Sequence, residues 1–254
     1  MTKGSRDQNI WDGIYLSYED LISKGKAFTS ERWLTRITDQ LLDYRNDVKR
    51  KNSASVLPPR ISELPIIAGE VCPKSIIDFG GSSAWAYEYL KNSLPRLSLD
   101  SYLVIEIPEI VRYMNDQKLH QPPVSFQTAT KEMTSVDILY TNSVLQYLPD
   151  DLIFTNLIKS TKPKYILIED FIGGRFNDYF TIQNYYESRI PVKFRNRDKF
   201  INLITIIGYE IIVSKPYPSI IQDKIVPFPM DNFPDDKQVS YSETLLFKRI
   251  ETRT

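Results

Sequence analysis

The sequence predicts an α/β fold, with a doubly wound and mostly parallel sheet that follows an N-terminal helical extension. Two observations support this. Beyond Pro73, short β-branched runs alternate with stretches of helical character, and this alternation favours a doubly wound sheet. The runs are nearly continuous in apolar residues and are bounded by turns, as is typical of parallel strands buried on both faces.

The pattern of apolar and polar residues in the first sixty positions differs from that in the rest of the chain. We therefore assign residues 1–60 to an N-terminal helical or lid segment and residues 61–254 to the main domain. From Leu34, apolar residues recur at spacings of three, four, three and four as far as Val48, which predicts one face of an amphipathic helix. Ser30 fits an N-cap for this helix, and Pro58 and Pro59 end any helix that reaches them.

The main domain carries the alternating elements in order. Strands are expected at 75–79, 102–107, 124–128, 137–142, 165–171, 209–214 and 244–250, and helices at 84–92, 108–118, 150–160 and 198–207. The segment from Pro216 to Gln238 is rich in proline and aspartate. We interpret it as a long irregular insertion, which in a compact domain is usually functional or mobile.

Composition argues against several classes of function. Acidic and basic side chains balance at 32 each, so no global field attracts nucleic acid or an anionic membrane. The single Cys72 excludes an intrachain disulfide, and with one histidine, His120, it argues against a Cys/His zinc site; no metal is expected. The neighbours of His120 indicate an exposed loop, which argues against His120 as a catalytic base.

The chain shows no signal-peptide core and no run of about 18 apolar residues. We therefore expect a cytoplasmic protein without a transmembrane segment. Peripheral association with a membrane surface stays open, and the sequence predicts no oligomeric state.

The turn Asp78-Phe79-Gly80-Gly81-Ser82-Ser83 follows the first strand, where ligands of open α/β sheets commonly bind. A dinucleotide site needs G-x-G-x-x-G, but Ser82 occupies the third position and Trp85 the last. A P-loop needs a lysine that does not follow. An acid before the glycines instead suits a ligand with a cationic end. S-adenosylmethionine (SAM) is such a ligand, because it carries an amine and a sulfonium.

Polar side chains at later strand ends extend this prediction. Glu106 closes the next strand, at the distance expected of an acid that hydrogen-bonds ribose hydroxyls. Simpler explanations stay open: an Asx turn at Asp78, a helix-dipole acid at Glu106, and helix caps at Asn142 and Ser143. The expected cofactor contacts are Asp78, Gly80, Gly81, Glu106, Ile107, Asn142, Ser143 and Gln146.

The motifs DFGGSSAWAYEYL, VIEIPEIV and DILYTNSVLQYL resemble those of class I SAM-dependent methyltransferases. More narrowly, the chain resembles a methyltransferase family of bacterial surface-polysaccharide and O-antigen gene clusters. That pattern begins W-x-G-x-Y-x-S-(W/Y), and continues with the acid-F-G-G turn, VLQYL, a strand-end acid and T-x-Q. The matching residues are Trp11, Gly13, Tyr15, Ser17, Tyr18, 78–81, 144–148, Asp170 and 181–183.

The resemblance spans about residues 11 to 210. It implies a Rossmann-like seven-stranded sheet with a terminal antiparallel hairpin, and transfer of a methyl group to a sugar hydroxyl. The chain departs from the pattern at Phe171, where the family often has arginine, and at the polar stretch 184–189. These departures bear on the acceptor more than on the cofactor.

A methyl transfer to a hydroxyl is helped by a general base, and with histidine effectively absent we expect a carboxylate or a tyrosine. Glu169 and Asp170 close the strand 165–171. Side chains alternate along a strand, so only one should face the site, and we favour Asp170. The alternative is a capping or salt-bridged surface acid. Residues expected at the acceptor are Trp11, Tyr147, Tyr179, Gln183 and Tyr185, with Trp11 alternatively a core anchor.

A basic cluster follows, made of Arg189, Lys193, Arg195, Arg197 and Lys199. It is either a solvated face or a contact for a diphosphate or lipid-linked glycan. The expected partners are a sugar, nucleotide-sugar or lipid-linked glycan acceptor, and no nucleic acid. Competing hypotheses are a catalytically degenerate SAM-binding protein, a methyltransferase with a non-sugar small-molecule acceptor, and a nicotinamide-dependent oxidoreductase, for which we find no phosphate site.

Overall fold

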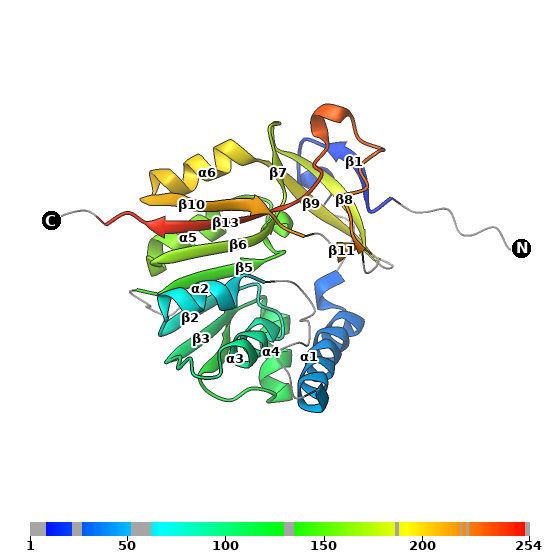
Figure 1. Ribbon diagram of the computed structural model, residues 1–254. Helices are drawn as coiled ribbons and strands as arrows, with labels where there is room; N and C mark the ends of the chain where they lie inside the picture. Colours follow the sequence, from blue (N-terminus) through cyan, green and yellow to red (C-terminus); the bar gives the residue numbers. More distant parts are fainter. Residues whose placement is uncertain are drawn as a thin grey trace, which may run out of the picture.

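The computed structural model describes residues 9–21, 27–51, 62–129, 135–185, 188–218, 220–221 and 224–251. Its central sheet has seven strands in the order β10-β13-β6-β5-β2-β3-β4 (Figure 1). The parallel strands are β2 (Ser75–Phe79), β3 (Ser101–Ile105), β4 (Val124–Gln127), β5 (Ile138–Asn142) and β6 (Tyr165–Phe171). Strand β13 (Glu243–Arg249) runs antiparallel to β6 and to β10 (Tyr209–Pro216). The α/β fold with a mostly parallel, Rossmann-like sheet is confirmed.

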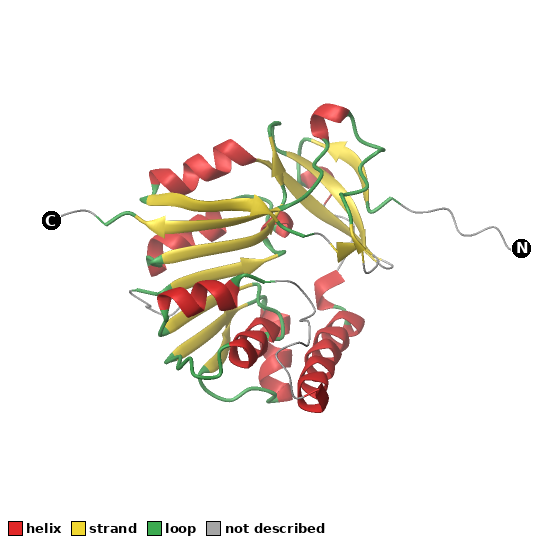
Figure 2. Cartoon of the chain, in the orientation of Figure 1, coloured by secondary structure: helices red, strands yellow, loops and turns green. Residues whose placement is uncertain are grey.

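Helices cover both faces of this sheet (Figure 2). The helices are α1 (Glu31–Lys51), α2 (Leu64–Val71), α3 (Trp85–Ser93), α4 (Pro108–Gln117), α5 (Leu152–Thr161) and α6 (Arg197–Ile206). Alternate residues of each strand point to opposite faces: Ile76 packs with α2, α3 and α4, whereas Ile77 packs with α5 and α6. In the described part of the chain, no helix is long and apolar enough to cross a membrane.

The predicted strands and helices beyond residue 73 agree with these elements, apart from ends that differ by a few residues. The predicted N-terminal helix is α1. Pro58 and Pro59, predicted to break it, lie outside the described residues. The segment from Pro216 to Gln238 includes two very short strands, β11 (Ile220–Ile221) and β12 (Lys224–Ile225), and the 3-10 helix η4 (Asp235–Lys237).

A second sheet, absent from the sequence analysis, lies beyond the carboxyl end of β6 (Figure 1). Its order is β1-β8-β9-β7, from β1 (Trp11–Tyr15), β8 (Tyr179–Tyr185), β9 (Ser188–Asn196) and β7 (Gly173–Gly174). Strands β8 and β9 form an antiparallel hairpin, and β1 pairs with β8 so that Trp11 faces Gln183. The N-terminal segment thus contributes a strand to a sheet otherwise formed by the region between β6 and α6.

Two members of the basic cluster on and after β9, Lys193 and Arg195, are buried and paired with carboxylates, so for these two the solvated-face interpretation is wrong. Arg195 is 1% exposed and its Nε lies 2.7 Å from Oδ1 of Asp151, while Nζ of Lys193 lies 3.1 Å from Oδ2 of Asp178. The other pairs of the cluster are Arg189–Asp12 and Arg197–Glu243. Because a buried cation needs a partner, the Arg195–Asp151 pair holds β9 against the start of α5.

His120 is also not in an exposed loop, contrary to expectation. Its side chain is 4% exposed, and burial lowers its pKa. Nε2 lies 2.8 Å from the carbonyl oxygen of Ser83, and Nδ1 lies 3.2 Å from the guanidinium of Arg45. A neutral ring that donates from Nε2 and accepts at Nδ1 satisfies both contacts, so His120 joins α1 to the Gly-Gly turn.

The conformation of Gly80 leads to a stability prediction. Gly80 has φ +74°, and a Cβ built there would collide with the side chain of Val144. We expect Gly80→Ala to lower the free energy of unfolding by at least about 2 kcal/mol, through both the positive φ and the collision. Urea denaturation measures this change.

The matched control is Gly69→Ala inside α2, where the nearest atoms to a new Cβ are Leu94 methyl carbons at 3.8 Å. It should be neutral or stabilise by roughly 0.5–1 kcal/mol, because alanine favours a helix interior. Equal effects at the two glycines would show that the turn does not require glycine.

Candidate functional site

A cavity of about 970 Å³ opens at the carboxyl ends of the parallel strands. At one end, here called the turn end, it is lined by Gly80–Ser83, Glu106, Trp85 and the α1 residues Trp33 and Arg36. At the other, the sheet end, it is lined by residues of the second sheet and by the loop around Tyr217. This size is typical of small-molecule sites.

Protein packing requires both glycines of the turn, Gly80 because of Val144 and Gly81 because of Asp78. A Cβ on Gly81 would collide with the Asp78 carboxylate, so this carboxylate is folded back beneath the turn. Asp78 is 2% exposed and accepts a 2.7 Å hydrogen bond from the Tyr102 hydroxyl. The simpler explanation, an Asx turn, does not describe this contact, because the hydroxyl belongs to the neighbouring strand β3.

Asp78 titrates near neutrality. Burial, assisted by the negative charge of Glu106 and opposed by the Tyr102 hydrogen bond, raises its pKa to about 7. A cationic ligand beside this carboxyl group would favour its ionised form.

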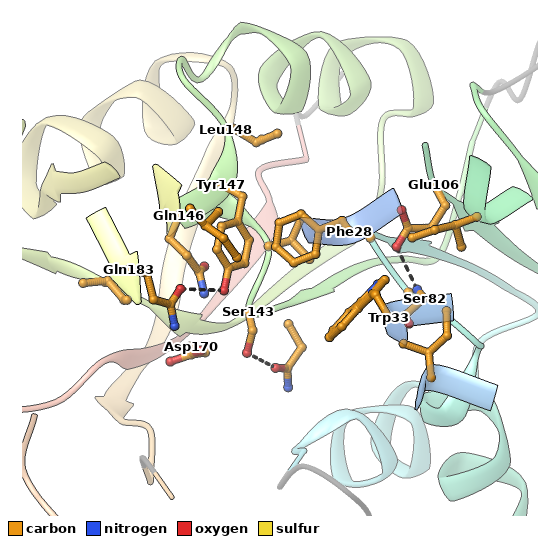
Figure 3. A pocket seen from close by; sticks show the side chains of 18 of the residues that line it. Phe28, Trp33, Ser82, Glu106, Ser143, Gln146, Tyr147, Leu148, Asp170 and Gln183 are labelled. Atoms are coloured by element: carbon orange, nitrogen blue, oxygen red, sulfur yellow. Dashed lines mark hydrogen bonds between the residues drawn. The ribbon is translucent and has the colours of Figure 1, made fainter. Parts of the chain in front are cut away.

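Glu106 lies against the same turn, as the dashed line in Figure 3 shows. Oε1 accepts a 3.0 Å hydrogen bond from Ser82 N–H, and Oε2 accepts one of 3.0 Å from Ile107 N–H. Burial raises the pKa of Glu106, while these two backbone bonds lower it. Each carboxylate oxygen can accept a second hydrogen bond, so Glu106 could also bind hydroxyls of a ligand.

The predicted residues at the end of β5 also line the cavity. The Asn142 amide donates to Oε2 of Glu169 at 2.9 Å, and Ser143 Oγ donates to Oδ1 of Asn142 at 2.8 Å. The helix-cap explanation is wrong here. The next helical turn, η3 (Leu145–Tyr147), is preceded by Val144 and has no side-chain cap bond. Gln146 is 5% exposed and lines the cavity.

The two acids at the end of β6 face different surroundings. Asp170 lines the cavity, and its Oδ1 accepts a 2.6 Å hydrogen bond from Ser242 Oγ. Glu169 is 1% exposed and, besides Asn142, accepts a 2.9 Å bond from the Tyr140 hydroxyl. Glu169 therefore orients its neighbours, and only Asp170 faces the cavity.

Backbone strain gathers around the cavity. Several non-glycine residues have positive φ, and three of them, Cys72, Lys118 and Lys162, simply end helices. Ser82, Ser143 and Asp170 have positive φ on the cavity wall. Such conformations persist where the surroundings impose them and are common at functional sites.

At the sheet end, the Tyr147 hydroxyl donates a 3.0 Å hydrogen bond to Oε1 of Gln183 (Figure 3). Trp11 lines the same end. Tyr179 does not line the cavity: its hydroxyl donates to the Lys237 carbonyl at 2.6 Å and its ring stacks on Phe194. Its predicted contact with the acceptor therefore lacks geometric support. The side chain of the predicted Tyr185 lies outside the described residues.

The sequence analysis missed Phe28, which lies between Tyr147 and Trp33 (Figure 3). Its ring centroid is 4.8 Å from that of Tyr147 and 5.4 Å from that of Trp33. Ser242 and Tyr217 were missed as well. Each belongs to a segment without a recognisable pattern, so only the folded chain brings it to the site.

Among the described residues that line the cavity, Asp78, Glu106 and Asp170 are acidic and Arg36 is the one basic side chain. Carboxylates in excess give the cavity a negative potential that attracts cations and repels anions.

No protein-family model and no curated protein sequence matches the chain. Solved structures do share its architecture. Human N-acetylserotonin methyltransferase, in complex with SAM, gives a TM-score of 0.52 at 12% identity, over 93% of this chain and 63% of that one. A chain of the complex between the Haloferax volcanii Trm112 methyltransferase activator and a methyltransferase gives 0.50 at 13% identity, over 88% and 97%. The protein thus has the fold of class I SAM-dependent methyltransferases, and the narrower resemblance to surface-polysaccharide enzymes stays a prediction.

Proposed function

We propose that the protein is a SAM-dependent O-methyltransferase that acts on a sugar hydroxyl of a bacterial surface glycan or its precursor. The observation that carries the proposal is the acidic cavity, which runs from the Gly-Gly turn, with Asp78 and Glu106, to Asp170 and the second sheet. The choice of a glycan rests on the motif resemblance in the sequence.

The residues of the turn end fit SAM. The carboxyl groups of Asp78 and Glu106, together with the single cation of Arg36, suit a ligand whose amine and sulfonium are cationic. Asp78 would pair with the amine, and Glu106 would accept hydrogen bonds from the ribose hydroxyls. A dinucleotide would instead bring a pyrophosphate to an acidic turn, which Coulomb repulsion disfavours.

When bound, SAM supplies a methyl group that its sulfonium already activates. The chain then has to align an acceptor hydroxyl, and alignment alone can lower a barrier by about 7–11 kcal/mol. Asp170 accepts the proton of that hydroxyl, and Ser242 holds the carboxylate in place through its 2.6 Å hydrogen bond. Glu169 orients Asn142 from behind the cavity.

Glu106→Gln tests the cofactor site. We expect S-adenosylhomocysteine to bind at least tenfold more weakly to this variant in titration calorimetry, because hydrogen bonds to a charged group contribute about 1.5–3 kcal/mol. The control is Glu109→Gln, which removes the same charge from an exposed position on α4. No binding of S-adenosylhomocysteine to the folded wild-type protein would refute the methyltransferase proposal.

Asp78→Asn should raise stability and weaken cofactor binding. Because the pKa of Asp78 is raised from 3.8 to about 7 in the folded state, the folded protein holds an extra proton between these values. Its stability therefore falls as the pH rises through this window. Asn does not titrate, so the variant escapes this loss. We expect the difference in free energy of unfolding between Asp78→Asn and the wild-type protein to increase in favour of the variant by roughly 2–3 kcal/mol from about pH 5 to about pH 8.

Urea denaturation at the two pH values measures the Asp78 effect, and calorimetry at about pH 8 measures the loss of S-adenosylhomocysteine affinity. Asp116→Asn, at an exposed position of α4, is the control. An advantage that does not change with pH would mean that Asp78 does not titrate in this range.

Asp170→Asn tests the general base. With any acceptor that the wild-type protein methylates, we expect the rate of methyl transfer to fall by roughly 10²–10⁴-fold while S-adenosylhomocysteine binds as before. Mass spectrometry of single-turnover reactions measures the rate, with Asp116→Asn again as the control. An unchanged rate would exclude Asp170 as the base, and a wild-type protein that binds cofactor but methylates no acceptor would favour the degenerate SAM-binding alternative.

A further inference from the structure

Two buried polar atoms at the sheet end of the cavity have no hydrogen-bond partner among the described residues: Nε1 of Trp11 and Oε1 of Gln146. The two side chains are 4% and 5% exposed, and both line the cavity. Proteins rarely leave a buried donor or acceptor unpaired. Where two side chains with such atoms line one cavity, a ligand is the natural source of their partners.

The two side chains belong to the same end of the cavity. Trp11 faces Gln183 across the β1–β8 ladder, and facing residues lie on one side of a sheet. Gln183 is bonded to Tyr147, which follows Gln146 in η3 and packs against the apolar cluster that contains Trp11. We therefore assign both side chains to the sheet end of the cavity, which both of them line.

The charges around this space exclude an anionic ligand group. Of the described residues at the sheet end, the charged one is Asp170, a carboxylate. The basic side chains of β9 are engaged elsewhere, since Lys193, Arg195 and Arg189 are paired with Asp178, Asp151 and Asp12. A phosphate placed here would meet negative charge without a compensating cation.

We propose that Trp11 and Gln146 form a subsite for an uncharged, hydroxyl-bearing sugar unit of the acceptor. A hydroxyl both accepts and donates hydrogen bonds, so the hydroxyls of such a unit can accept from the indole N–H and donate to the amide oxygen. Phe228 and Ile190 form an apolar part of the cavity wall, against which the C–H groups of the sugar can pack. The ring of Phe228 lies edge-on to that of Trp11, with 4.9 Å between their centroids. This inference rests on the proposed function and narrows the acceptor to a neutral glycan unit, rather than a nucleotide sugar whose diphosphate enters the cavity.

The three tryptophans of the chain allow a direct test, because all of them line the cavity. Protein with ¹⁵N-labelled tryptophan gives one indole N–H signal for each, and Trp11→Phe identifies that of Trp11. Addition of S-adenosylhomocysteine should move the signals of Trp33 and Trp85 at the turn end. Addition of neutral methyl glycosides (gluco, galacto, manno, rhamno and fuco) to this complex should then move the Trp11 signal downfield for at least one sugar.

For that glycoside, we expect Gln146→Leu and Trp11→Phe each to weaken binding at least tenfold, and the matching glycosyl 1-phosphate to bind at least tenfold more weakly. The control is Tyr179→Phe, which removes a polar atom from the same apolar cluster but one that is bonded to the Lys237 carbonyl, away from the cavity. Glycoside binding to this variant should match that to the wild-type protein.

The failures of the two proposals are distinguishable. If S-adenosylhomocysteine moves neither Trp33 nor Trp85, the proposed function fails. If it does move them, the subsite is overturned by any of three results: a Trp11 signal that no glycoside moves, a phosphate that binds as tightly as its glycoside, or unchanged affinity in both Trp11→Phe and Gln146→Leu.

Discussion

The Asp78 carboxylate is folded back beneath the bare backbone of Gly81, and the turn end of the cavity depends on this contact. A side chain at residue 81 would collide with the carboxylate, and one at Gly80 would collide with Val144 from the neighbouring strand end. The turn therefore remains close to the sheet, where Glu106 can accept the Ser82 N–H. The packing of this turn thus places two acids, Asp78 and Glu106, on the cavity wall that a cationic ligand would contact.

The acidic side chains at the strand ends are all carboxylic acids, but their surroundings differ, and so do the roles that we assign to them. Asp78 and Glu169 are buried and Glu106 is half-buried, and desolvation raises the pKa of each. The cost of burying Glu169 is offset by hydrogen bonds from Tyr140 and Asn142, which make it part of the scaffold. Asp78 and Glu106 line the cavity and keep capacity to bind a ligand, as does Asp170.

The second sheet adds a wall to the cavity at the carboxyl ends of the parallel strands. It takes its hairpin, β8–β9, from the segment after β6 and its outer strand, β1, from the start of the chain. The buried pair of Arg195 and Asp151 ties this sheet to α5. Loss of either partner would leave the other charge without compensation, and for the buried Arg195 this is costly.

The sequence by itself determined the order of strands and helices, the Gly-Gly turn with Asp78, the strand-end Glu106, and the expectation that only one of Glu169 and Asp170 faces the cavity. Each of these follows from a local period, of two residues in a strand or 3.6 in a helix, and from turn chemistry. Tertiary structure alone decided the second sheet, the burial of His120, the pairing of the basic cluster and the position of Tyr179 away from the cavity. These depend on contacts between residues far apart in the chain, and a local pattern carries no information about which distant residue will supply the partner.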